Sequence, residues 1–94
     1  MTTLSSTIHI PEDVLFHELS GEAVILNVTT GKYYGLDEVG TRMWALLAEH
    51  GRLEPAYQAL LAEYDVDEAR LQQDLIELVD RLAANELVQV EDAA

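Results

Sequence analysis

The stretch that decides the fold is Glu22-Ala-Val-Ile-Leu-Asn-Val-Thr-Thr-Gly-Lys-Tyr-Tyr-Gly-Leu36. Its first half, Glu22 to Val28, is rich in strand-forming residues, and Lys32 to Leu36 resumes an extended pattern. Between them, Thr29-Thr-Gly31 has the composition of a turn in which the glycine takes a positive φ angle. The stretch therefore predicts a β-hairpin. Gly35 inside the second strand indicates a bulge or a close approach of another backbone.

Shorter extended segments are expected on either side of this hairpin. Val14 to Leu19 is predicted as a strand that follows Pro11, a residue that interrupts strand pairing unless it lies at an edge. Leu87 to Val90 has the composition of a short terminal strand. Residues 1 to 7 and the last four residues have the composition of frayed ends, so we expect an ordered core from about residue 8 to residue 90.

Three helices are predicted after the hairpin. The first has Asp37 as its N-cap and ends at Gly51, and the second starts near Pro55 and runs to about Tyr64. The third runs from about Glu68 to Ala84. It carries an apolar stripe with spacings of four, three and four: Leu71, Leu75, Leu78 and Leu82. Strands followed by three helices predict an α+β fold of the winged helix-turn-helix type, with a three-stranded antiparallel sheet.

Length and charge limit the possible functions. The 94 residues suffice for a single domain, residues 1 to 94. Eighteen acidic residues against five basic ones give a net charge of −13, which repels nucleic acid and anionic membrane surfaces. A DNA-reading third helix would need a basic surface, whereas residues 67 to 84 carry five carboxylates and two arginines. The acidity either steers a cationic peptide toward the chain or only keeps a small domain soluble.

The sequence also predicts the cellular compartment. Its apolar runs are far shorter than the roughly 20 residues of a membrane span. The start, Met1 to Ser6, lacks the basic residues and apolar core of a secretory signal. Because the chain has no cysteine, it has neither a disulfide framework nor a thiolate metal site. These features predict a cytoplasmic protein.

Catalytic, cofactor and metal sites are not expected. Cysteine is absent, lysine occurs once, and no serine lies in a glycine-flanked elbow, so an activated nucleophile is missing. His9, His17 and His50 do not recur with metal-ligand spacing, and the five glycines form no nucleotide-binding motif. We therefore expect a binding module and not an enzyme.

The second strand of the hairpin is the candidate binding element. In strand addition, an extended peptide pairs with the free backbone of an edge strand beside an apolar helix. Lys32 to Leu36 suits the edge, and the leucines of the third helix suit the wall beside it. The alternative is that Tyr33 or Tyr34 and the leucine stripe belong to the core, as we expect for Trp44.

The residues around the hairpin also resemble a known family. Leu26-Asn-Val-Thr-Thr-Gly-Lys-Tyr-Tyr-Gly-Leu-Asp-Glu-Val-Gly-Thr-Arg-Met-Trp-Ala-Leu-Leu47 resembles the PqqD-like family, also called RiPP recognition elements, after ribosomally synthesised and post-translationally modified peptides. The family shares a strand-turn-strand that leads through L-(N/D)-x-x-(G/A) into a helix with an (I/M)-W pair. Leu-Leu-Ala-Glu-Tyr-Asp-Val-Asp67 and the final Leu87-Val also match, so the resemblance covers about residues 14 to 90.

The resemblance implies three strands followed by three helices and a non-catalytic function. Family members bind the leader of a precursor peptide as an added strand between the third strand and the third helix. On the strand side it implies Lys32, Tyr33, Tyr34, Gly35 and Leu36. On the helix side it implies Arg70, Leu71, Asp74, Leu75 and Leu78. The Tyr-Tyr-Gly-Leu phrase is most similar to the lasso-peptide member, which presents the precursor to a separate transglutaminase-like leader peptidase.

Three other functions remain open from the sequence. They are a PqqD-type peptide chaperone for a radical-SAM enzyme, an acidic winged-helix regulator and an oligomerisation module. A regulator would shift operator DNA at low salt, and an oligomerisation module would self-associate without any leader peptide.

Overall fold

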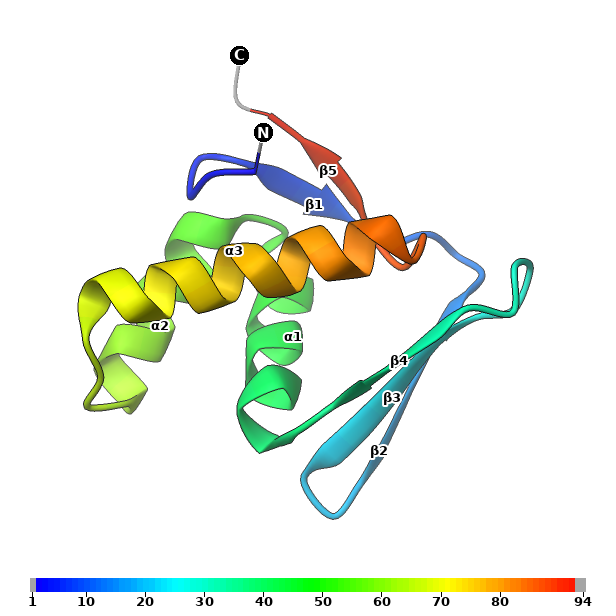
Figure 1. Cartoon of the computed structure of the whole chain (residues 1–94), viewed down its shortest axis with the longest axis horizontal. Helices are drawn as coiled ribbons and strands as arrows, with labels where there is room; N and C mark the ends of the chain where they lie inside the picture. Colours follow the sequence, from blue (N-terminus) through cyan, green and yellow to red (C-terminus); the bar gives the residue numbers. More distant parts are fainter. Residues whose placement is uncertain (1, 93–94) are drawn as a thin grey trace.

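The computed structural model describes residues 2–92, which form two antiparallel sheets and three helices (Figure 1). The larger sheet has the order β2-β3-β4, with β2 at Val14–Leu19, β3 at Glu22–Asn27 and β4 at Tyr33–Leu36. The smaller sheet pairs β1, Thr7–His9, with β5, Gln89–Glu91. The helices are α1, Glu38–His50, α2, Leu53–Glu63, and α3, Glu68–Ala84. The predicted α+β fold is confirmed.

Both hairpin turns place a glycine at a positive φ angle. The turn between β2 and β3 places Ser20 and Gly21 at φ angles of 57° and 85°, as a two-residue hairpin loop requires. In the turn between β3 and β4, Gly31 has the predicted positive φ, 78°. The register from Ala23–Leu36 to Leu26–Tyr33 is continuous, so the bulge suggested for Gly35 is wrong.

The helix boundaries follow their capping residues. Asp37 accepts a hydrogen bond from Gly40 N at 2.8 Å at the start of α1, and Asp67 accepts one from Arg70 N at 2.9 Å at the start of α3. Helix α2 begins at Leu53, two residues before the predicted start at Pro55. Proline is tolerated there because the first N–H groups of a helix have no partner within the helix.

The small sheet was not predicted. Residues 1 to 7 were expected to be frayed, whereas Ser6 is buried and Thr7 begins β1. Ile8 N donates to Gly51 O at 2.8 Å, which ties β1 to the link between α1 and α2. Strands of three residues are too short to show alternation in the sequence. β5 begins later than expected because Leu87 still belongs to the turn that ends α3, where Leu87 N donates to Leu82 O at 2.9 Å.

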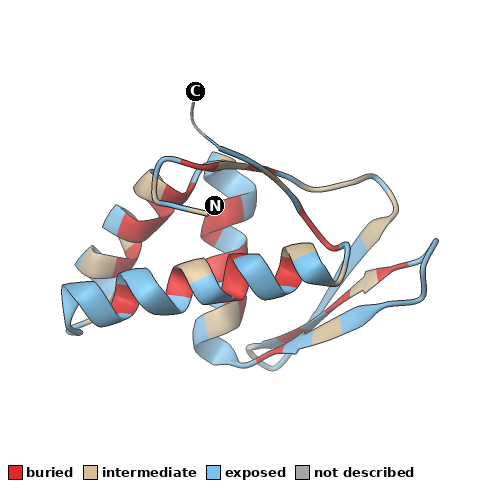
Figure 2. Cartoon of the chain, turned by 45° about the horizontal axis from the view of Figure 1, so that its top comes forward, coloured by how far each residue is buried: buried red, intermediate tan, exposed pale blue. Residues whose placement is uncertain are grey.

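The core lies where the three helices meet the inward face of the larger sheet (Figure 2). Its fully buried large side chains are Ile25, Leu47, Leu53, Leu60, Leu75, Leu82, Leu87 and Val79. Trp44 is buried, as predicted, and its ring stacks on Phe16 of β2 with centroids 6.1 Å apart. The sheet is therefore attached to the helices mainly through α1.

The outward face of the larger sheet remains exposed and carries several large apolar side chains beside His17 and Glu22. Because side chains alternate along a strand, Leu15 and Leu19 of β2, Val24 of β3 and Tyr33 of β4 share the face turned away from the helices. The exposed fractions of Leu19 and Tyr33 are 66% and 69%. Tyr33 is thus not a core residue. Within residues 2–92, the structure has no helix with the length and apolar character needed to cross a membrane.

Candidate functional site

Strand β4 lies at the edge of its sheet, and half of its backbone polar groups face away from β3. Asn27 N donates to Lys32 O at 2.9 Å, so these residues form a hydrogen-bonded pair of the antiparallel ladder. Hydrogen-bonded and non-hydrogen-bonded pairs alternate along such a ladder, which makes the pairs of Tyr33 and Gly35 non-hydrogen-bonded. The N–H and C=O groups of Tyr33 and Gly35 therefore point to the open edge, where another strand could pair.

A groove of about 390 Å³ runs beside this edge, between β4, the start of α1, and α3. Its β4 wall consists of Tyr34, Gly35 and Leu36, and the start of α1 adds Asp37, Val39, Gly40 and Met43. Its α3 wall consists of Asp74, Glu77, Leu78 and Arg81. Buried apolar side chains meet charged groups at the rim. The lining therefore combines apolar side chains with four charged groups, so a ligand here would meet both kinds of surface.

The motif Leu36-Asp-Glu-Val-Gly40 builds the corner of the groove. Leu36, the last residue of β4, is buried, and Asp37 caps α1 by accepting a hydrogen bond from Gly40 N. A Cβ atom on Gly40 would lie 3.2 Å from both the Asp37 carboxylate and a Leu36 methyl group. The small residue at this position therefore lets the edge strand turn directly into the helix.

The rim of the groove is predominantly acidic. It carries the carboxylates of Asp37, Asp74 and Glu77 and one guanidinium, that of Arg81. Arg81 Nη1 lies 3.5 Å from Tyr34 Oη across the groove, and this hydrogen bond raises the pKa of Arg81, which stays charged. Arg70 neutralises Asp74 only in part, because their closest atoms are 3.8 Å apart and exposed.

Of the ten residues predicted as binding contacts, five line the groove. They are Tyr34, Gly35, Leu36, Asp74 and Leu78. The structure brings these residues together from β4 and α3, which are far apart in the sequence. Their role as contacts stays a prediction.

The other five predicted residues lie outside the lining. Lys32 precedes β4 and pairs with Glu86 at 3.5 Å, and the side chain of Tyr33 lies on the outward face of the sheet. Arg70 is exposed on the first turn of α3. Leu71 and Leu75 are buried in the core, on the side of α3 that faces the other helices. A substitution of Leu75 would therefore test folding before it tests binding.

Six lining residues were not among the predicted contacts. They are Asp37, Val39, Gly40, Met43, Glu77 and Arg81. Helical spacing could have found half of them: Val39 and Met43 are four residues apart on α1, and Arg81 follows the predicted Leu78 by three residues on α3. The missing information was which edge of the apolar stripe of α3 faces β4.

Metal-ligating side chains do not gather in the described part of the chain. Within residues 2–92, no group of three or more histidine, aspartate or glutamate residues is placed to hold a metal ion.

Comparison with known proteins gives one family and two similar structures. The family model of coenzyme PQQ synthesis protein D (PqqD) matches residues 22–88. A structure of TbiB1 in complex with the TbiA(beta) leader peptide is 40% identical, with a TM-score of 0.79, over 85% of this chain and 93% of that chain. A lasso peptide synthetase B1, also complexed with the leader peptide, is 19% identical, with a TM-score of 0.77, over 88% and 98% of the two chains, and shows the fold alone. No curated protein sequence matches the chain.

Proposed function

The chain belongs to the PqqD family, and we propose on this basis that it binds the leader segment of a ribosomally made precursor peptide. The leader would pair with β4 as an added strand and place alternate side chains in the groove. The single observation that carries the proposal is the free edge of β4, where the backbone groups of Tyr33 and Gly35 point away from β3 beside the groove between β4 and α3.

The chemistry of the groove supports this mode of binding. Side chains of an added strand that lie beside Tyr34 and Leu36 would share the inward face of the sheet. They would then contact the apolar parts of the groove, at Met43 and Leu78. Gly35 has no side chain on the outward face of the sheet, where a Cβ atom built on it would have no neighbour within 4 Å. Main-chain pairing would supply affinity, and the groove would select side chains.

We further propose that the precursor is that of a lasso peptide and that the chain delivers it to a separate leader peptidase in the cytoplasm. The similarity to TbiB1, whose structure holds a leader peptide, supports a partner of this class. Delivery requires no catalytic group on this chain. Holding the leader raises the effective concentration of the attached precursor at an enzyme that binds both proteins.

A labelled leader peptide tests the proposed function. Titration of the chain against fluorescent TbiA(β) leader is expected to give saturable binding with a Kd of about 10 μM or tighter, equivalent to roughly 7 kcal/mol. A scrambled peptide of the same composition is the control, because it keeps charge and hydrophobicity but loses the sequence. The same titration can be repeated with the leader of the precursor peptide encoded beside the gene for this chain. Equal binding of native and scrambled leaders would refute sequence recognition.

One observation favours a second candidate, the oligomerisation module. The exposed apolar residues Leu15, Leu19, Val24 and Tyr33 form a surface of the kind that often marks a protein interface. Two copies stacked through this face would bring two charges of −13 together, so association should strengthen as salt screens the repulsion. Light scattering after size exclusion, at low and high salt, is expected to detect dimers that the double substitution Leu19→Ser and Val24→Thr removes. A monomer under all conditions would exclude this candidate.

A further inference from the structure

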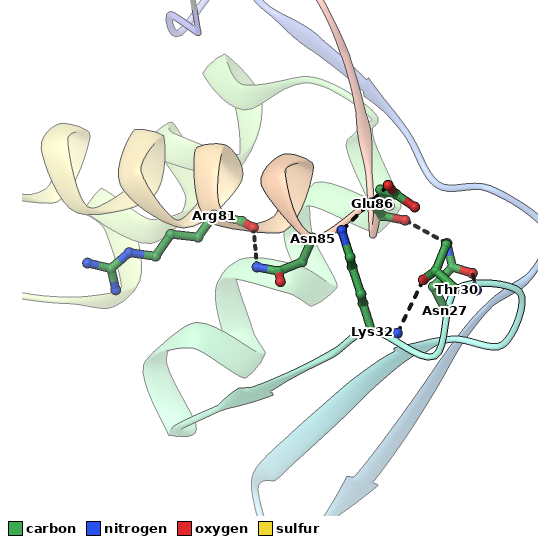
Figure 3. Close-up of polar contacts among 6 residues, drawn as sticks. All are labelled: Asn27, Thr30, Lys32, Arg81, Asn85 and Glu86. Atoms are coloured by element: carbon green, nitrogen blue, oxygen red, sulfur yellow. Dashed lines mark hydrogen bonds and ion pairs between the residues drawn. The ribbon is translucent and has the colours of Figure 1, made fainter.

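Asn27 is a buried polar residue at the end of β3 whose side-chain oxygen and nitrogen both form hydrogen bonds. The residue is 5% exposed. Asn27 Oδ1 accepts hydrogen bonds from Thr29 N at 2.9 Å and Thr30 N at 3.1 Å, which shape the turn of the hairpin. Asn27 Nδ2 donates to Glu86 O at 2.8 Å, across 59 positions of sequence (Figure 3). The residue therefore joins the hairpin to the segment that follows α3.

Glu86 has the left-handed backbone conformation that commonly ends a helix, with Glu86 N donating to Ala83 O and Leu87 N donating to Leu82 O. Its φ angle is 60°, in the left-handed region that residues with side chains seldom adopt. The Glu86 carboxylate lies 3.5 Å from Lys32 Nζ (Figure 3). Both the carbonyl and the side chain of Glu86 thus hold the hairpin. We call Asn27, Lys32 and Glu86 the clasp.

The clasp lies at one end of the groove. It joins the beginning of β4 to the end of α3, and from there the two elements diverge toward the start of α1 (Figure 1). The sheet packs mainly on α1. The clasp and the hydrogen bond between Arg81 and Tyr34 tie the hairpin to the end of α3, so the clasp contributes to the distance between β4 and α3 along the groove.

We propose that Asn27 is a positioning residue of the leader-binding groove. Through its bond to Glu86 it fixes the closed end of the groove, and with it the spacing between β4 and α3. This inference rests on the proposed function. An added strand must lie about 4.8 Å from β4 and also pack its side chains against α3, so an error of about 1 Å in this spacing costs affinity. Asn27 itself does not line the groove.

The substitution Asn27→Asp isolates the bond to Glu86. It keeps an oxygen to accept from the amides of Thr29 and Thr30, but it replaces the amide donor with a carboxylate that repels the Glu86 carbonyl. We expect the Kd for TbiA(β) leader to rise at least roughly tenfold at about pH 7.5. The matched control is Asn85→Asp, because Asn85 Nδ2 also donates to a carbonyl, that of Arg81 at 2.8 Å, without touching the hairpin. It should change the Kd less than about twofold.

Recovery of leader affinity by Asn27→Asp at acid pH distinguishes a positioning role of residue 27 from a purely structural one. Protonation gives the introduced carboxyl an O–H donor for Glu86 O. Burial and the nearby carboxylates of Asp13 and Glu86 raise its pKa, whereas Lys32 and the hydrogen bonds from the amides of Thr29 and Thr30 lower it. The Kd of Asn27→Asp relative to that of the wild type at the same pH should therefore fall between about pH 7.5 and pH 5.

Each outcome decides the proposal. An unchanged Kd at neutral pH in a folded variant, or a ratio that does not fall with acid, would overturn it. If Asn27→Asp does not fold, Asn27→Ser removes the same bond without a charge, because its hydroxyl reaches the turn amides but not Glu86. That variant should show the same tenfold loss, and normal affinity would overturn the proposal. Failure of the wild type itself to bind any leader would instead refute the proposed function.

Discussion

Replacing Gly35 with proline is expected to raise the Kd for a leader peptide at least roughly 100-fold, equivalent to about 2.8 kcal/mol, while the domain stays folded. Proline removes the N–H group that faces the open edge and puts ring atoms where an added strand would approach. The bonds between β3 and β4 survive, because Gly35 forms a non-hydrogen-bonded pair with Val24. Proline is tolerated on an edge strand whose N–H faces solvent.

The control for this experiment is Gly35→Ala. Alanine keeps the N–H group, and its Cβ atom would have no neighbour within 4 Å, so binding should weaken by less than about threefold. Circular dichroism and thermal unfolding should show both variants folded, and fluorescence anisotropy with labelled TbiA(β) leader measures the Kd. Wild-type affinity in a folded Gly35→Pro variant would eliminate strand addition at β4. Loss of binding in both variants would mean that the outer surface of Gly35, and not its backbone, is recognised.

Local signals in the sequence account for most of the fold. The hairpin follows from strand-forming residues around a glycine turn, and Asp37, Gly51 and Asp67 mark helix ends by capping, which acts within a single turn. The pairing of β1 with β5 could not be predicted in this way. It joins Thr7 to Glu91, across almost the whole chain, through strands of only three residues. Such pairing depends on tertiary packing, which leaves no periodic pattern in so short a segment.

The prediction placed three of five residues on the strand side in the groove, Tyr34, Gly35 and Leu36, and two of five on the side of α3, Asp74 and Leu78. The place of residues 32 to 36 in the hairpin identified the strand. Which face of α3 is turned toward β4, however, depends on how the helix packs. Leu71, Leu75, Leu78 and Leu82 form one continuous stripe in sequence, and nothing in their spacing distinguishes core from groove. In the structure only Leu78 of these residues lines the groove. The clasp was also hidden, since Asn27 appeared only as part of a strand and Glu86 as part of the acidic tail.

The free edge of β4 and the clasp meet two opposite structural requirements of the hairpin. Strand addition needs the outer side of β4 to be unpaired, whereas a defined groove needs the hairpin to be held rigidly beside α3. The structure separates these demands along the strand: the clasp holds the beginning of β4 at Lys32, and Gly35 remains open further along. A hairpin held only through α1 would leave the width of the groove free to vary, at a cost in affinity.

Two substitutions on α3 are expected to separate effects on stability from effects on binding. Leu75→Ala should mainly lower the stability of the domain, and Leu78→Ala should mainly lower its affinity for the leader. Leu75 is fully buried at 0% exposure and does not line the groove, so Leu75→Ala should lower the free energy of unfolding by about 2–5 kcal/mol. That is a large part of the roughly 5–15 kcal/mol typical of a domain. Leader affinity of the remaining folded protein should change less than about threefold.

Leu78→Ala should show the reverse pattern, because Leu78 is 9% exposed and lines the groove. Its loss of stability should be the smaller of the two, whereas loss of the apolar contact should raise the Kd for the leader roughly tenfold, equivalent to about 1.4 kcal/mol. Urea unfolding gives the stabilities, and leader titration at about 15 °C, where both variants are folded, gives the affinities. The comparison also tests the sequence-based prediction that Leu75 contacts the leader. Equal losses of affinity would place both leucines in the binding surface and require α3 to turn when the leader binds.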